Sequence, residues 1–185
     1  MKRTIISSLI ATSALLSSAA QATNTVNGGT VKFEGQLVSS ACALDVSSLN
    51  QTVQMGQVRT SAFSKKGDKS SPVAFNIVLT GCKTGPDGGQ GNDKTVAVGF
   101  SAVQDNKDDK DVISLAGGDG SARGIGLQIT DRSKKAVMLD GTPSTEITLN
   151  DDRVEVPFTA AYISTENSVT SGRANASVVF TLTYQ

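Results

Sequence analysis

The sequence predicts an all-β protein built as an antiparallel β-sandwich. Short segments of alternating apolar and polar residues are separated by turn-forming clusters of Gly, Asn and Asp, as in sandwich domains. Gly, Ser and Thr are abundant, aromatic residues make up 4% of the chain, and there is neither Trp nor His. Beyond the N-terminal leader, no segment has a helical period longer than a single turn. We therefore expect a core of Val, Ile, Leu, Ala and Phe.

The first 22 residues have the pattern of a secretory signal peptide. Two basic residues open the chain, residues 5–19 form an apolar core interrupted by serines, and residues 20–22 (Ala-Gln-Ala) form a small-x-small cleavage site. That core is shorter than the roughly 20 residues that cross a bilayer, and no later run approaches this length. We expect an exported, soluble mature chain of 163 residues, 23–185, that forms one domain.

The charge and residue content argue against several functions. Without the two basic residues of the leader, 15 basic and 17 acidic residues remain, a net charge of −2. A nucleic-acid partner usually requires a clustered basic face, so none is expected. Without His, Ser-His-Asp and Cys-His catalytic arrangements are excluded. A carboxylate pair for glycoside hydrolysis stays open as an alternative, although the sequence singles out no pair. We expect no enzyme activity and no cofactor.

The acidic segment 105–111 (Asp-Asn-Lys-Asp-Asp-Lys-Asp) raises the alternative of a calcium site, since oxygen ligands at alternate positions bind that ion. It lacks the turn glycine and the terminal bidentate Glu of a calcium loop, and its two lysines reduce its charge. We interpret it as a solvated surface loop and expect no metal site.

Cys42 and Cys82 are the only cysteines. In an exported protein, a lone pair of this kind predicts one intramolecular disulfide. The closed loop of about 40 residues corresponds to a stabilisation of roughly 4 kcal/mol. Two free thiols or a metal pair are the alternatives, but a metal would need two further ligands and no His is available.

The predicted strands follow one another along the chain. Val73–Leu79 is the most hydrophobic run, and we expect it to form a central strand that ends near Cys82. Asp140-Gly141 and the segment 150–152 are turn signals between later strands. The other predicted strands are 31–37, 42–46, 53–58, 95–103, 112–115, 125–130, 136–139, 147–149 and 154–163.

The stretch 172–185 has the most regular alternation of the chain, which predicts a half-buried strand. Its apolar face consists of Ala174, Ala176, Val178, Phe180, Leu182 and Tyr184. No further strand follows it. Because an uncovered strand edge is prone to aggregation, we expect both edges to pair with an earlier segment or with another molecule.

Several motifs resemble those of the major structural subunits of type 1 fimbriae, which assemble by the chaperone–usher route. The resemblance covers essentially the whole mature chain and includes the penultimate Tyr184 and Gly172, the fourteenth residue from the C-terminus. Its motifs are T-V-N-G-G-T-V-K-F-E-G at 25–35, A-C-A-L-D at 41–45, Q-T-V-Q-M-G-Q-V-R-T at 51–60, L-D-G at 139–141 and the final F-T-L-T-Y-Q.

The resemblance implies an incomplete immunoglobulin-like sandwich that lacks its last strand and is completed by donor-strand exchange. Residues 23–38 would be the donor-strand extension and residues 39–185 the pilin domain. The donor strand would use Gly29, Val31, Phe33, Gly35 and Leu37. The acceptor groove, which would also bind the chaperone, would include Gly172, Val178, Phe180, Leu182 and Tyr184.

The implied partners are copies of the same chain, other fimbrial subunits, a periplasmic pilus chaperone and an outer-membrane usher. The chain would pass through the periplasm and form the shaft of a cell-surface fimbria that supports bacterial adhesion. The alternatives are a minor or adaptor pilin near the fimbrial tip and a secreted β-sandwich enzyme. Residues 31–37 have two alternatives of their own: a first strand of the same domain, or self-complementation of the monomer.

Overall fold

The computed structural model describes residues 30–38, 40, 42–82, 95–105 and 109–185. The predicted signal peptide, Gly29 and residues 106–108 of the acidic segment lie outside these residues. Residues 30–36 belong to a separate unit from residues 37–185, and the two are described separately. Residues 30–36 contain no assigned strand, and all of their side chains are exposed.

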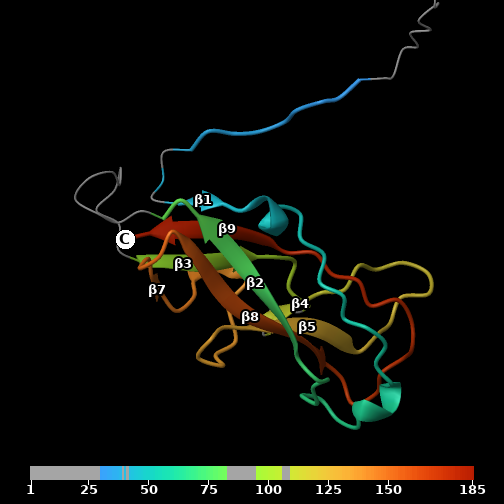
Figure 1. Cartoon of the computed structure of the whole chain (residues 1–185). Helices are drawn as coiled ribbons and strands as arrows, with labels where there is room; N and C mark the ends of the chain where they lie inside the picture. The colour runs from blue at the N-terminus through green and yellow to red at the C-terminus, as the bar shows by residue number, and fades with distance from the viewer. Residues whose placement is uncertain (1–29, 39, 41, 83–94, 106–108) are drawn as a thin grey trace, which may run out of the picture. The chain divides into compact units, whose positions relative to one another are not determined.

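The larger unit contains a five-stranded antiparallel sheet with the strand order β1–β2–β8–β5–β4. In this sheet β8 is hydrogen-bonded on both edges, to β2 on one side and to β5 on the other (Figure 1). The strands are β1 (Ala43–Leu44), β2 (Val73–Thr80), β4 (Val112–Ile113), β5 (Ile125–Thr130) and β8 (Arg153–Ser164).

A second antiparallel sheet is organised around β3, which pairs with the three other strands of that sheet. Figure 1 shows β9, in red, running beside β3. The strands are β3 (Thr95–Ser101), β6 (Asp140–Pro143), β7 (Ile147–Thr148) and β9 (Val179–Tyr184). Two single-turn 3-10 helices, η1 (Val46–Ser48) and η2 (Thr60–Ala62), are the only helices among the described residues, and neither is long enough to cross a membrane.

The core lies between the two sheets and is formed by the alternating apolar residues of their strands. Phe100 of β3 packs edge-on against Phe158 of β8, with ring centroids 4.9 Å apart, and this contact joins the two sheets. Phe75 of β2 stacks on the other side of Phe158 at 5.7 Å. The all-β, antiparallel class predicted from the sequence is therefore confirmed.

One turn prediction is wrong. Asp140-Gly141 was expected to be a turn after a strand at 136–139, but β6 begins at Asp140, and Ala136 forms only an isolated bridge with Thr130. Pairing with β3 fixes this segment: Gly99 lies opposite Pro143, and Ser101 lies opposite Asp140. Gly141 has a φ of 86°, so it provides the bend that a turn signal indicates, but within an irregular strand.

Candidate functional site: a groove along the last strand

Among the described residues, β9 pairs with another strand along one of its two edges, the edge that faces β3. Thr95 and Gln185 exchange both backbone hydrogen bonds, with N–O distances of 2.8 and 3.0 Å. In an antiparallel pair, hydrogen-bonded and non-hydrogen-bonded positions alternate, so Thr181 and Thr183 direct their backbone groups toward β3. Phe180 and Leu182 therefore direct their N–H and C=O groups to the other edge, where they meet no backbone group of the described residues.

The same geometry continues upstream of β9, although no strand is assigned at 174–178. Side-chain exposure alternates from Ala174 through Phe180, and the even-numbered residues pack against the core. The carbonyl of Asn175 points the other way and accepts a hydrogen bond from the backbone N–H of Ala116 at 2.7 Å. The face predicted from the sequence is correct, but the ladder is missing because this stretch has no strand partner along its length.

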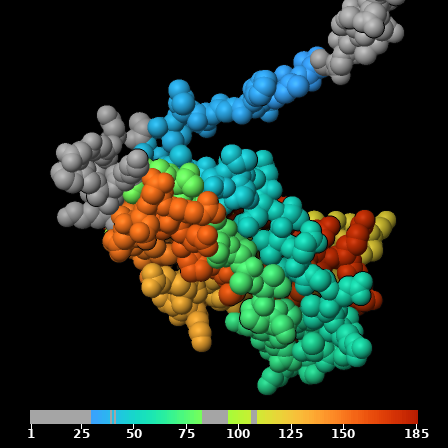
Figure 2. Space-filling view, viewed as in Figure 1, coloured from blue at the N-terminus to red at the C-terminus, as the bar shows by residue number. Residues whose placement is uncertain are grey.

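A second extended segment, residues 49–57, lies across from β9. Val53 and Met55 are half-buried and alternate with exposed residues, which explains why the sequence predicted a strand here. No backbone hydrogen bond joins residues 50–58 to any other described residue, so the structure assigns no strand. In Figure 2 this segment, in cyan, runs over the surface of the domain.

Between these two walls lies a groove with a volume of about 1090 Å³. One wall consists of residues 49–57 and the other of residues 174–180. The floor is apolar and belongs to strands of both sheets: Phe75, Ile77, Phe100, Leu127, Ile129, Ala160 and Tyr162. The groove thus opens directly onto the core between the sheets. The groove separates residues 49–57 from residues 174–180, and each of these two extended segments has an edge without a strand partner among the described residues.

The floor residue Tyr162 connects to both walls of the groove. It belongs to a small buried cluster with Phe63 and Ile125, against which Met55 of one wall and Ala174 of the other both pack. The hydroxyl of Tyr162 donates to the carbonyl of Ala174 at 2.7 Å. Burial raises the pKa of this phenol, so the hydroxyl keeps its proton and acts as a donor.

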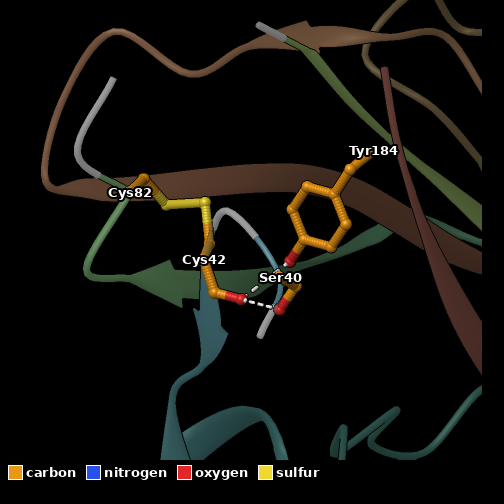
Figure 3. Close-up of a disulfide and its surroundings, with 4 residues drawn as sticks. All are labelled: Ser40, Cys42, Cys82 and Tyr184. Atoms are coloured by element: carbon orange, nitrogen blue, oxygen red, sulfur yellow. Dashed lines mark hydrogen bonds between the residues drawn. A yellow bond between two sulfur atoms is a disulfide. The ribbon is translucent and has the colours of Figure 1, made fainter. Parts of the chain in front are cut away.

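The C-terminal end of β9 is tied to the first sheet beside the disulfide (Figure 3). Cys42 and Cys82 are bonded, as expected, and link the start of β1 to the segment after β2. The Tyr184 hydroxyl donates to the carbonyl of Cys42 at 3.2 Å, and the Ser40 hydroxyl donates to the same carbonyl at 2.6 Å. The chain has two tyrosines, and each forms a long-range contact beside the groove. Tyr162 joins β8 to Ala174, and Tyr184 joins β9 to Cys42.

Of the predicted acceptor residues, Val178 and Phe180 line the groove directly. Leu182 and Tyr184 continue the same face and pack against the core. Gly172 lies elsewhere: an added Cβ would approach the backbone nitrogen of Ala122 to 2.4 Å, so this position is a close contact between two backbone segments.

The predicted donor residues are notably exposed. Val31, Phe33 and Leu37 have 75%, 90% and 101% of their surface accessible, and Gly35 has open space where a side chain would be. Exposing three large apolar side chains at alternate positions is unfavourable in water. Such a set typically indicates a surface that becomes covered by a partner.

The second wall and the floor of the groove were not predicted from the sequence. Alternation at Val53 and Met55 indicated a strand, but alternation does not reveal whether a strand has a partner. Tyr162 was part of a predicted strand, and nothing in its sequence neighbourhood indicated a contact with Ala174, because that contact depends on tertiary structure.

The sequence raised the acidic segment 105–111 as an alternative calcium site, and its described aspartates form contacts with other side chains. Asp111, from the acidic segment, accepts a hydrogen bond from the Gln128 side-chain amide at 2.6 Å, and Asp109 pairs with Lys66. Within the described ranges no three His, Cys, Asp or Glu residues are placed to hold a metal ion.

The fold and the groove define a class: a β-sandwich domain that is open along its last strand. Comparison with known proteins then identifies the family. A sequence profile of the fimbrial protein family matches residues 31–185. The type-1 fimbrial protein A chain of Escherichia coli K12 is 43% identical over 166 residues, which are 89% of this chain and 87% of that protein. The fimbrial subunit type 1 of Klebsiella pneumoniae is 41% identical over 189 residues, with 100% of both chains covered.

Solved structures agree with the sequence relatives. A subunit of a chaperone–usher pilus superposes with a TM-score of 0.73 and 29% identity, covering 89% of this chain and 100% of that one. The P pilus rod subunit PapA gives a TM-score of 0.64 and 25% identity, with coverage of 79% and 100%. The chain belongs to the fimbrial protein family and is a structural fimbrial subunit.

Proposed function

We propose that this chain polymerises into the shaft of a type 1-like fimbria by donor-strand exchange. Residues 23–38 of one copy act as the donor strand and occupy the groove of the next copy. The donor face is Gly29, Val31, Phe33, Gly35 and Leu37. The acceptor face includes Val178, Phe180, Leu182 and Tyr184.

The observation that carries this proposal is the groove itself, which has an apolar floor and an unpaired strand edge on each wall. Buried backbone N–H and C=O groups need hydrogen-bond partners, and an extended peptide supplies them on both of its edges. A strand inserted between residues 51–57 and 176–182 would therefore satisfy both walls at once. A small molecule or a helix would satisfy neither wall along its length.

The donor segment has the side chains that such a groove requires. Val31, Phe33 and Leu37 alternate, so they would all point into the floor when the segment is extended. Burying them at about 1.5–3 kcal/mol each gives roughly 5–9 kcal/mol before the cost of ordering the segment. Each backbone hydrogen bond adds about 0.5–1.5 kcal/mol net. These terms together favour a long-lived junction between copies.

The proposal also assigns partners before assembly. An empty groove of this kind exposes core residues and unpaired strand edges, which promote aggregation. A periplasmic pilus chaperone would cover the groove with a strand of its own. At an outer-membrane usher, the extension of a neighbouring subunit would replace the chaperone strand. Residues 1–22 would direct export to the periplasm, and the finished fibre would be extracellular.

The substitution Gly35→Arg tests the proposal, with Gln36→Arg as its matched control. Gly35 is on the donor face and Gln36, the next residue, is on the opposite face, so the same new side chain is directed into the groove in one variant and toward solvent in the other. We expect Gly35→Arg to abolish fibres in electron micrographs while the subunit is still exported, and Gln36→Arg to form fibres. Normal fibres from Gly35→Arg would contradict the proposed donor face.

A further inference from the structure

The hydroxyl of Tyr162 donates a hydrogen bond to a backbone carbonyl on the edge of residues 174–182 that faces the groove. The carbonyl groups that point away from β3 are those of the even-numbered residues, because Asn175 bonds to Ala116 on the other side. Ala174 is the next even-numbered residue after Ala176, and its carbonyl accepts the Tyr162 hydroxyl at 2.7 Å. Among the described residues, the carbonyls of Ala176, Val178, Phe180 and Leu182 have no backbone partner on this edge.

The same residue belongs to a buried cluster that residues of both walls contact. Tyr162 is 7% exposed and forms one cluster with Phe63 and Ile125, and Met55 and Ala174 pack onto this cluster from the two walls. Packing from both walls therefore converges on one cluster at the position where the row of available carbonyls ends. A hydrogen-bonding limit and a packing limit coincide there.

We infer that Tyr162 is a positioning residue that ends the acceptor edge at Ala176 and so sets the register of an inserted strand. This inference rests on the proposed donor-strand exchange. The core-facing positions from Ala176 to Leu182 remain available on the edge before Tyr184, whose hydroxyl bonds to the Cys42 carbonyl, and the alternate donor positions from Val31 to Leu37 match them. For an inserted strand antiparallel to β9, as in every strand pair of the two sheets, the register set by this stop pairs Leu37 with Ala176, Gly35 with Val178, Phe33 with Phe180 and Val31 with Leu182.

The register has structural consequences for the junction between copies. At the end of the groove next to Tyr162, Leu37 of the donor lies opposite the small Ala176. The next donor residue on this face, Gly35, lies opposite the larger Val178. A slip of two residues toward Tyr162 would place Leu37 opposite Ala174, whose carbonyl is already bonded. Such a slip would also move the neighbouring subunit by about 7 Å, two residues of an extended strand.

Cysteine cross-linking in assembled fibres of the full chain measures this register. Glu34 is on the outward face of the donor, and its partner in the proposed register is Val179; slips of two residues pair it with Ser177 or Thr181. All three partners are exposed on the outer face. The outward positions are non-hydrogen-bonded pairs with Cα atoms about 4.5 Å apart, within the range of a disulfide.

With Tyr162 present, we expect covalent oligomers from the Glu34→Cys/Val179→Cys pair and none above background from Glu34→Cys/Ser177→Cys. In the Tyr162→Phe background the ring is kept and the hydroxyl is lost. We expect the yield from the Ser177→Cys pair to rise roughly 2- to 10-fold, the effect of one hydrogen bond. Ser70→Ala is the matched control, because it removes the hydroxyl that bonds to the Tyr162 backbone N–H, and it should leave the ratio unchanged.

The outcomes separate this inference from the proposal beneath it. Equal cross-linking at Ser177→Cys and Val179→Cys with Tyr162 intact overturns the inference, and this arm needs no Tyr162 variant to fold. An unchanged ratio in Tyr162→Phe fibres also overturns it. If fibres form and none of the three pairs cross-links between copies, donor-strand exchange itself is contradicted.

Discussion

β8 and β9 both alternate core-facing apolar residues with outward-facing residues, but they differ in how their edges are paired. β8 is paired with β2 on one edge and β5 on the other, and its core-facing residues from Val154 to Ser164 are all buried. Within the part of the chain that the structure describes, β9 has a strand partner on one edge, β3, and its core-facing residues Phe180, Leu182 and Tyr184 are half-buried. The alternation of apolar residues is the same in both strands, so the difference lies in what covers the second edge.

The difference shows where one subunit depends on another. A fully paired strand obtains its stability within its own chain. A strand with one free edge and half-buried apolar side chains gains stability when a further strand joins it. In the proposed fibre, a neighbouring copy would provide this further strand.

Phe158 and Phe180 test the contrast most strongly, because both contact Phe100. Phe158 is 2% exposed, so Phe158→Ala should lower the free energy of unfolding of the subunit by about 3–5 kcal/mol. Phe180 is half-buried, so Phe180→Ala should lower the free energy of unfolding of the subunit by less than Phe158→Ala does. In the fibre, where a donor strand would cover Phe180, the loss caused by Phe180→Ala should be larger than in the subunit. Urea unfolding of subunit and fibre measures both. Equal losses for the two variants in the subunit would remove the distinction between the strands.

Loss of the disulfide tests the tie between β1 and the end of β2. The paired substitutions Cys42→Ser and Cys82→Ser should destabilise the subunit by about 2–4 kcal/mol, since the unfolded chain regains the freedom of a loop of 40 residues. Urea unfolding with and without a reducing agent checks this value. If the unmodified chain is insensitive to the reductant, the bond contributes less than its loop length indicates.

Gly99 lies in β3, the strand that pairs with β9. A Cβ at this position of β3 would lie 2.4 Å from the carbonyl oxygen of Gly141, so Gly99→Ala must displace β6 or β3. We expect a loss of about 1–3 kcal/mol in unfolding free energy. Gly117→Ala is the control, since nothing lies within 4 Å of its added Cβ. Similar stabilities for the two variants would show that β3 tolerates the displacement.

Asp131 tests a connection between the sheets away from the groove. It is buried at the end of β5; burial alone would raise its pKa, but hydrogen bonds from the Thr145 hydroxyl and from the backbone N–H groups of Lys135 and Ser133 outweigh this and lower it. The ionised form therefore stabilises the fold above the ordinary pKa of 3.8, and this contribution is lost as the pH falls through the lowered pKa.

The expected result is a steeper loss of thermal stability below about pH 4 in the unmodified chain than in Asp131→Asn. Fibre assembly at neutral pH should be unaffected, because Asp131 is not part of the groove. Identical acid profiles for the two proteins would show that these hydrogen bonds do not favour the ionised form.

Much of the fold follows from sequence patterns. Alternation located β8, which buries every second residue. The apolar runs located β2, β3 and β5, in which consecutive residues are buried. The strand β6 was missed because Gly141 is a turn signal taken out of its tertiary context, where pairing with β3 decides the conformation.

The candidate site was partly predictable for the same reason. The face of β9 follows from alternation, but the walls of the groove do not, because Val53 and Val178 have the pattern of paired strands and lack the pairing. The Tyr162 contact joins β8 to Ala174 in the unassigned stretch before β9, and no local pattern encodes it. Whether an edge is free depends on the whole fold.

Residue-level amide hydrogen exchange measures whether a further strand joins the second edge of β9 in the fibre. Thr181 and Thr183 donate to β3, so their amides should be protected in both the isolated subunit and the fibre. The amides of Phe180 and Leu182 point into the groove, and they should exchange rapidly in the subunit and become protected in the fibre. If the Phe180 and Leu182 amides exchange as rapidly in fibres as in the subunit, no strand joins this edge and donor-strand exchange at this groove is contradicted.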